Sequence, residues 1–256
     1  MGNSDFKKKL QSGAPLAGTF VKTPSVQVIE VLAQSGLDFI CLDAEHSPFD
    51  RSSLDSCVAM ARALDFPVVV RVGDSSPREI LQALDYGASG IVIPHVETVA
   101  QAEAVVRAAH FGLGGRGFAG STRWAGYATR PMAEVLARSQ AETIVLPQIE
   151  EPAAVEICEE IAAVAGVDGL FLGPADLSVG YGHTSVDNDD LKAALHRVGA
   201  ACKASGKAFV SFVPTGDGAK VWAAEYGVQV FCIASEHAWM RSGASEAAKA
   251  VHEIDG

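Results

Sequence analysis

The sequence alternates short apolar runs with segments of helical periodicity, and this alternation repeats eight times. Each run has about five apolar residues, the length of a strand buried on both faces, and a segment with helical spacing follows each. The expected strands are 15–21, 39–42, 68–72, 90–94, 143–148, 169–172, 208–212 and 228–233. The expected helices are 25–34, 51–64, 77–86, 99–109, 152–163, 189–204, 216–226 and 235–254. Eight such units in 256 residues predict one α/β domain over residues 1–256, a closed (β/α)8 TIM barrel.

An open, doubly wound sheet is the alternative architecture for such a repeat. Its glycine fingerprint, G-x-G-x-x-G, is absent after the first expected strand, which favours the barrel. One glycine-rich segment, at about 110–131, interrupts the rhythm and is expected to form a rim loop. Arg116, Arg123 and Trp124 in this loop favour contact with substrate, and a mobile surface excursion is the alternative.

The formal net charge is −11, and no block of Lys or Arg occurs beyond Lys7 to Lys9, so the chain lacks the electrostatic footprint of a nucleic-acid or anionic-membrane protein. No apolar run approaches the roughly 18 residues of a membrane span. The five cysteines show no C-x-x-C spacing, which is typical of a reducing compartment and predicts a cytoplasmic protein. Small molecules and copies of the chain are the expected partners.

Polar and ionisable residues stand where the expected strands end, whereas the strand bodies are nearly free of them. In a barrel the carboxyl ends of all strands meet on one face, which carries the active site. The candidates are Lys22, Thr23, Asp43, Glu45, His46, Arg71, Asp74, His95, Gln148, Glu150, Gly173, Pro174, Asp176, Ser211, Pro214, Ser235, Glu236 and His237.

Glu150 and Asp176 follow consecutive strands, so a right-handed crossover places both on the same rim. Two carboxylates with open positions are the ligand set that Mg²⁺ or Mn²⁺ prefers, although solvated loop acids are the alternative. Gly173 and Pro174 predict a tight turn before Asp176, with backbone N–H groups directed at the site. Gln148, two residues before Glu150, is expected on the same side of its strand.

His46 is a candidate general base, because Asp43 three residues earlier can hold its imidazole tautomer and raise its basicity. Arg71 follows four apolar residues, and its planar guanidinium suits a carboxylate or a developing enolate. The alternatives are a loop histidine and an ion pair of Arg71 with a neighbouring acid such as Asp43. Imine chemistry is disfavoured, because Lys22 is the only lysine near the carboxyl rim and Lys207 precedes its strand.

Five ordered motifs, LDAEHSPFD, VVVRV, LDYGASGIVIPHV, LPQIE and GLFLGPADLS, resemble the HpcH/HpaI family of class II pyruvate aldolases. The resemblance covers about 15–236 and implies a barrel of the phosphoenolpyruvate/pyruvate-domain type. It implies a lyase that reversibly cleaves 4-hydroxy-2-oxo acids to pyruvate and an aldehyde through a metal-bound enolate. A divalent metal (Mg²⁺, Mn²⁺ or Co²⁺) and no organic cofactor is the implied requirement.

The resemblance also implies residue roles. Glu150 and Asp176 would ligate the metal, and His46 would be the base, supported by Asp43 and Asp85. The implied substrate contacts are Arg71, which also stabilises the enolate, Gln148, Gly173, Ala175 and Asp176, with Pro174 in the same turn. From its sequence position alone, at the end of the helix 77–86, Asp85 is expected on the surface.

The family is commonly a hexamer, a trimer of dimers with exchanged C-terminal helices, which assigns that exchange to the segment 235–254. Two departures lie near the rim: His110-Phe111-Gly112 replaces the usual Tyr-Pro-Pro, and His95 replaces a residue that does not titrate. They leave the aldehyde open and allow hydroxypyruvate as the donor. A citrate-lyase-like or malyl-CoA-lyase-like enzyme and a catalytically silent barrel are the alternative functions.

Overall fold

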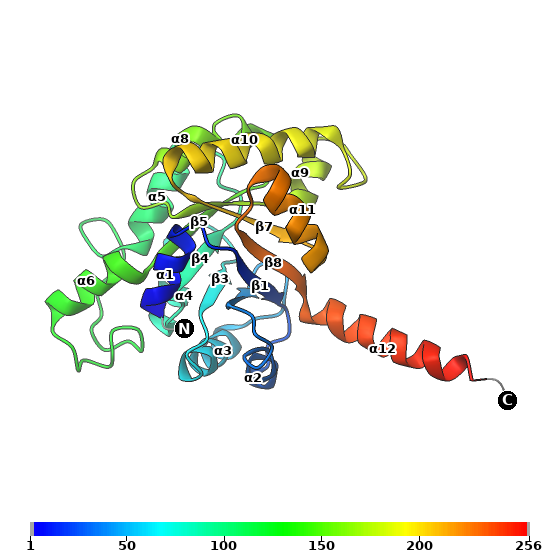
Figure 1. Ribbon diagram of the computed structural model, residues 1–256. Helices are drawn as coiled ribbons and strands as arrows, with labels where there is room; N and C mark the ends of the chain where they lie inside the picture. Colours follow the sequence, from blue (N-terminus) through cyan, green and yellow to red (C-terminus); the bar gives the residue numbers. More distant parts are fainter. Residues whose placement is uncertain (1–2, 255–256) are drawn as a thin grey trace.

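The computed structural model describes residues 3–254, in which eight parallel strands close into a barrel surrounded by helices (Figure 1). The strands pair in sequence order, and the last pairs with the first, so the predicted (β/α)8 barrel is confirmed. The strands are β1 (Leu16–Val21), β2 (Phe39–Asp43), β3 (Val68–Arg71), β4 (Gly90–Ile93), β5 (Ile144–Ile149), β6 (Gly169–Leu172), β7 (Ala208–Val213) and β8 (Val230–Ser235). The helices are α1 (Asn3–Gln11), α2 (Val26–Leu32), α3 (Arg51–Ala63), α4 (Pro77–Tyr86), α5 (Val99–Ala109), α6 (Met132–Glu142), α7 (Pro152–Val155), α8 (Cys158–Ala163), α9 (Pro174–Gly180), α10 (Asp189–Ser205), α11 (Gly216–Tyr226) and α12 (Glu236–His252).

Local sequence signals determine where many helices begin and end. Five helices start after a residue whose side chain accepts a hydrogen bond from a backbone N–H of the first turn, which satisfies one of the donors left free at a helix N-terminus. These N-cap residues are Asp50, Ser76, Thr98, Asn188 and Thr215. Three helices end at a glycine with left-handed backbone, where a side chain would be strained. These are Gly87, Gly206 and Gly227.

Two apolar layers hold the barrel together. One lies between the strands and the surrounding helices, and the other fills the interior of the barrel. Every residue of β2, β3, β4 and β6 is buried, as expected of parallel strands covered on both faces. Within residues 3–254 no helix has the length and apolar character needed to cross a bilayer. All five cysteines are buried and unpaired.

The structure differs from the sequence prediction at several boundaries. The expected helix 152–163 is divided into α7 and α8, because Ile157 leaves the helical backbone (φ −128°, ψ 22°). The last strand begins two residues later than expected and ends at Ser235. Helices α1, α6 and α9 were not predicted. The apolar pattern of α1 is short, because it consists of Phe6 and Leu10, one helical turn apart.

Helix α1 closes the end of the barrel where the strands begin. Phe6 and Leu10 are 0% and 1% exposed and belong to the apolar layer that fills the barrel interior. Between them, the Lys7 Nζ donates to the Thr143 carbonyl oxygen at 2.6 Å and lies 2.9 Å from an Asp168 carboxylate oxygen. Both acceptors immediately precede strands, so α1 is anchored to the amino-terminal end of the barrel and leaves the carboxyl end open.

The segment 110–131 does not lie on the catalytic rim, contrary to the expectation. It follows α5, and helices of a barrel run antiparallel to the strands, so the segment leaves α5 at the amino-terminal end of the barrel. Arg116 pairs with Asp85, Arg123 pairs with Asp55, and the buried Trp124 donates its backbone N–H to the Asp85 carbonyl oxygen. These three residues attach the loop to α3 and α4 of their own chain.

Removal of the Phe6 side chain tests whether α1 closes the amino-terminal end of the barrel. Phe6→Ala should lower the free energy of unfolding by about 3 kcal/mol or more, because it leaves a cavity in a closed apolar interior. Leu113→Ala, at a fully exposed position, is the matched control and should change it by less than about 0.5 kcal/mol. Equal small losses in urea denaturation of both variants would show that α1 does not seal the barrel.

Candidate active site

Asp43 and Arg71 form the most buried ion pair at the open end of the barrel. They stand opposite each other in the register of β2 and β3, so their side chains leave the sheet on the same face. Arg71 donates from Nε and Nη2 to the two Asp43 carboxylate oxygens, at 3.0 and 2.8 Å. Lys22 adds a third donor to Asp43 at 2.6 Å. The ion pair with a neighbouring acid, considered for Arg71 from the sequence, is therefore present.

This network keeps Asp43 ionised and fixes Arg71 in place. Burial alone would raise the pKa of Asp43, but the hydrogen bonds from Arg71 and Lys22 lower it to about 2. The Arg71 guanidinium also lies 4.6 Å above the centre of the Phe20 ring. Within the described chain its Nη1 makes no hydrogen bond, so this donor is free for an anion in the barrel mouth.

His46 lies at the edge of the mouth with 57% of its side chain exposed. Its backbone N–H donates to Asp43 Oδ1 at 3.1 Å, whereas its ring nitrogen Nε2 lies 3.5 Å from Glu45 Oε2. Asp43 thus holds the turn that carries His46 and does not contact the ring. The acid beside the imidazole is Glu45, which corrects the expectation from the spacing of Asp43 and His46.

Glu150 follows β5 and is almost completely buried at the centre of the mouth. Gln148, two residues earlier and on the same side of the strand, donates its side-chain amide to Glu150, and Gln148 Oε1 is buried without a hydrogen bond. A Cβ at Gly173 would lie 3.0 Å from the Glu150 Cβ and 3.1 Å from Gln148 Nε2. Glycine at 173 therefore keeps the space beside this pair open.

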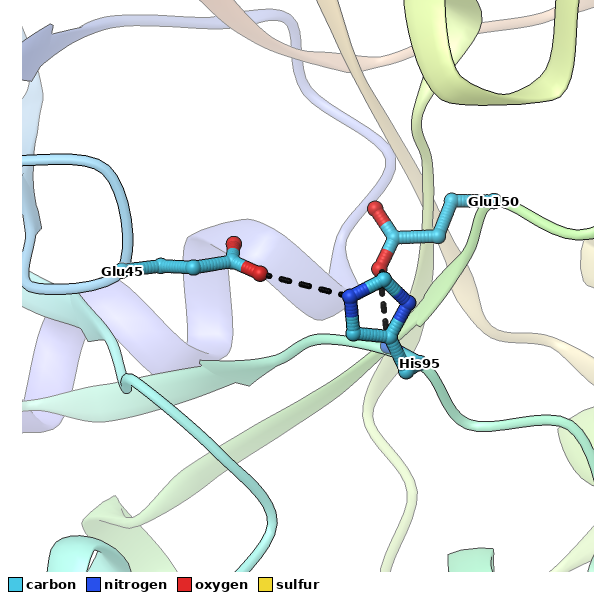
Figure 2. Close-up of side chains that lie close together, drawn as sticks. All are labelled: Glu45, His95 and Glu150. Atoms are coloured by element: carbon cyan, nitrogen blue, oxygen red, sulfur yellow. Dashed lines mark hydrogen bonds and ion pairs between the residues drawn. The ribbon is translucent and has the colours of Figure 1, made fainter. Parts of the chain in front are cut away.

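Three acids and one histidine gather around Glu150. His95, at the end of β4, donates its backbone N–H to Glu150 Oε1 at 2.7 Å, and its ring hydrogen-bonds Glu151. Figure 2 shows the His95 ring between Glu45 and Glu150. Burial, together with the charges of Glu45 and Asp176, raises the pKa of Glu150 to about 7, although His95 opposes the shift. The hydrogen bond to Glu151 raises the pKa of His95.

The site fits a divalent cation. Burial, and then the charges of neighbouring acids, raise the pKa of Glu150, which shows that too little positive charge surrounds this carboxylate. A bound cation would supply that charge. Glu45, His95 and Glu150 each offer one ligand atom, and these atoms lie within 4.8 Å of one another. Asp176, expected as the second ligand, is exposed in the first turn of α9 after Pro174 and Ala175, and it acts on Glu150 through its charge.

Asp85 lies away from these residues. It stands near the end of α4, on the side of the barrel where the strands begin, and its carboxylate accepts from Arg116 Nε at 3.2 Å. Arg116 is 3% exposed and stacks on Phe111, which fixes Asp85 against the segment 110–131. The support of His46 by Asp85, implied by the family resemblance, is not found within one chain.

Several residues around the site received no role from the sequence. Lys22, Glu45 and His95 stood among the strand ends, but their contacts depend on strand register and on the left-handed backbone of His95 (φ 54°). Glu151 was missed, although it directly follows Glu150. Glu236, at the start of α12, accepts from the backbone N–H groups of Lys22 and Thr23 at 2.8 and 2.6 Å and so positions Lys22.

Comparison with known proteins identifies the family. Residues 16–228 match the model of the HpcH/HpaI aldolase/citrate lyase family. A hydroxypyruvate/pyruvate aldolase of Paraburkholderia phytofirmans is 33% identical over 254 residues, 96% of each chain. A 4-hydroxy-2-oxovalerate aldolase of Novosphingobium aromaticivorans is 34% identical over 220 residues, 83% of this chain and 78% of the relative.

Solved structures agree. A crystal structure of an HpcH/HpaI aldolase/citrate lyase family protein from Burkholderia cenocepacia superposes with a TM-score of 0.92 at 32% identity, covering 98% of this chain and 100% of the other. The chain belongs to the HpcH/HpaI aldolase/citrate lyase family and is a carbon–carbon lyase. The resemblance inferred from the five motifs is confirmed.

The raised pKa of Glu150 predicts how metal binding depends on pH. Below about pH 7 the carboxyl is protonated and must lose its proton to bind a cation. The affinity for Mn²⁺ should therefore rise about tenfold per pH unit up to about pH 7 and level off above it. Calorimetric titration between pH 5.5 and 8.5 measures this, and Glu150→Gln should bind Mn²⁺ too weakly to be detected at any pH in this range. A flat profile would contradict the role of Glu150.

Proposed function

We propose that the enzyme is a divalent-metal-dependent aldolase. It cleaves 4-hydroxy-2-oxo acids reversibly to an aldehyde and either pyruvate or hydroxypyruvate. The observation that carries the proposal is the mouth of the barrel, where the buried Glu150 of raised pKa lies among acids and Arg71 offers a free donor. The aldolase names of relatives at 33% and 34% identity support it.

Glu150 and Asp176 hold the metal in this proposal, and Mg²⁺, Mn²⁺ and Co²⁺ are the candidates. When bound, the cation polarises the keto oxygen of the substrate and stabilises negative charge on it, which is worth several kcal/mol in such reactions. No organic cofactor is required, because the chemistry needs only a base and charge stabilisation. The donor set, which is carboxylate-rich and surrounded by further acids, suits this cation class.

Arg71 binds the 2-oxo acid. Its Nη1 is the donor left free by Asp43, and its fixed position, beneath the mouth and over Phe20, suits a planar carboxylate or enolate. Gln148 supplies the buried Oε1, which has no protein donor, and Gly173 leaves the space in which the substrate lies. Pro174, Ala175 and Asp176 border the same space in the first turn of α9.

His46 is the base. It takes the proton of the 4-hydroxyl group, and the O–H electron pair becomes the carbonyl bond of the departing aldehyde. The electrons of the C3–C4 bond pass to C3 and form the enolate of the 2-oxo acid, which Arg71 stabilises. Return of a proton to C3 completes the product. Glu45, 3.5 Å from the ring, is the acid that orients the imidazole.

The assembly is part of the proposal. Helix α12 extends away from the barrel (Figure 1), and its exposed Trp239 and Met240 line an apolar groove with Val28 and Val31 of α2. We propose that α12 is exchanged between subunits of a hexamer, a trimer of dimers, in the cytoplasm. The expected partners are the 2-oxo acid and the aldehyde, not nucleic acid or membrane.

Exchange of the pyruvate methyl protons with solvent tests this function without knowledge of the aldehyde. Metal-loaded enzyme in D₂O should deuterate pyruvate, EDTA should abolish the exchange, and Mg²⁺, Mn²⁺ or Co²⁺ should restore it, as followed by proton NMR. Free 4-hydroxy-2-oxo acids should be cleaved and acyl-CoA thioesters should not. Absence of exchange with metal present would indicate a silent barrel, and turnover of thioesters alone would indicate a CoA-dependent lyase.

His46→Ala should lower kcat for aldol cleavage by about 10² to 10⁴-fold, the usual contribution of a general base. Metal should still bind to this variant, because His46 is not one of the proposed ligands. His196→Ala, on the outer helix α10 beside Tyr226, is the control and should retain full activity. A normal kcat in the His46 variant would show that His46 is not the base.

A further inference from the structure

Three strand ends converge on one point of the mouth. Glu45 follows β2, His95 follows β4 and Glu150 follows β5, and one ligand atom from each lies within 4.8 Å of the others (Figure 2). Of these three residues, only Glu150 is among the metal ligands proposed above, which are Glu150 and Asp176. Glu45 and His95 are left without a task in the aldol reaction beyond the orientation of His46.

The backbone holds His95 over the mouth. His95 has a left-handed backbone (φ 54°), which is uncommon outside glycine and persists where surrounding structure enforces it. Its own N–H donates to Glu150 Oε1 at 2.7 Å, so the residue is attached to Glu150 through its main chain. This attachment leaves the ring nitrogen Nδ1 3.1 Å from Glu150 Oε1 and the other ring nitrogen, Nε2, 3.5 Å from Glu45 Oε1.

Glu45 provides an independent sign of a ligand. Its side chain is 9% exposed, and its Oε2 is buried without a hydrogen bond, although Arg71 Nε lies 3.3 Å away. Arg71 directs its hydrogen bonds at Asp43 instead. Glu45 Oε2 therefore has only ion-pair contacts, with Arg71 Nε at 3.3 Å and His46 Nε2 at 3.5 Å, and no hydrogen bond. A buried carboxylate without hydrogen bonds is costly, and a cation between Glu45 and Glu150 would stabilise it.

We propose that Glu45 and His95 coordinate the metal together with Glu150, so that this enzyme has a mixed imidazole–carboxylate site. The proposal rests on the function proposed above and refines its metal centre. Ligand atoms around a divalent cation are about 3 to 4.3 Å apart when each lies about 2.1 Å from it. The cluster, at 4.8 Å or less, needs only a small contraction to reach this geometry.

An imidazole ligand changes which metal the site prefers. Imidazole nitrogen binds Co²⁺ more tightly than Mn²⁺, whereas Mg²⁺ prefers oxygen ligands and retains water. The enzyme should therefore select Mn²⁺ or Co²⁺ over Mg²⁺ more strongly than a site of Glu150 and Asp176 alone.

Electron spin echo spectroscopy of the Mn²⁺-loaded enzyme tests the proposal directly. A coordinated imidazole produces ¹⁴N modulation, which should be present in the wild type and lost in His95→Gly with Mn²⁺ still bound. Glycine suits the left-handed backbone at 95, so this variant keeps the fold. His46→Ala is the control and should retain the modulation. No ¹⁴N modulation in the wild type, or modulation that persists in His95→Gly, would overturn the proposal.

Metal affinities provide the second measurement. His95→Gly should weaken Mn²⁺ binding roughly tenfold or more and Mg²⁺ binding by less, and Glu45→Gln should weaken Mn²⁺ binding while the ¹⁴N modulation remains. Equal losses for both metals in His95→Gly, or unchanged Mn²⁺ affinity in Glu45→Gln, would refute the ligand roles. Metal-dependent pyruvate exchange by an enzyme without ¹⁴N modulation would reject this inference alone and leave the proposed function intact.

Discussion

The burial of a carboxylate at the open end of the barrel is the constraint on which the site depends. Glu150 is held in place by the His95 backbone and Gln148, and its neighbours Glu45 and Asp176 carry the same charge. Asp43, by contrast, is neutralised by Arg71 and Lys22. The mouth therefore contains one acid, Asp43, whose charge is neutralised and which fixes Arg71. It also contains a group of acids around Glu150 whose negative charge is not neutralised and favours a bound cation. Catalytic sites commonly retain such unfavourable charge because function needs it.

The two ends of the barrel divide stability from chemistry. At the end where strands begin, α1 inserts Phe6 and Leu10 into the interior, and Lys7 pairs with Asp168. The apolar contacts there stabilise the barrel without a ligand. At the opposite end, short polar segments follow the strands and place acids, histidines and Arg71 close together. The strands thus act as rigid supports for groups that repel one another.

The sequence predicts the strands better than the contacts. Apolar runs such as Val68–Arg71 are legible because parallel strands are buried on both faces, and the positions of Glu150 and Arg71 at strand ends follow directly. Helix α1 was not predicted because it has only two buried apolar residues, and they are buried only by contact with the closed barrel. The partner of the His46 ring was misassigned, since spacing cannot tell that Asp43 turns towards Arg71. The segment 110–131 was predicted at the wrong end of the barrel, because its glycine-rich composition indicates a loop but does not indicate at which end of the barrel the loop lies.

The most direct test of the account compares Glu150→Gln with the wild type in thermal unfolding at pH 8, with and without Mn²⁺. Without metal the variant should be as stable as the wild type or more stable, because a buried charge is removed and the new amide can donate to the buried Gln148 Oε1. Mn²⁺ should raise the melting temperature of the wild type only. A variant that is less stable without metal and is still stabilised by Mn²⁺ would contradict the claim that Glu150 anchors the cation.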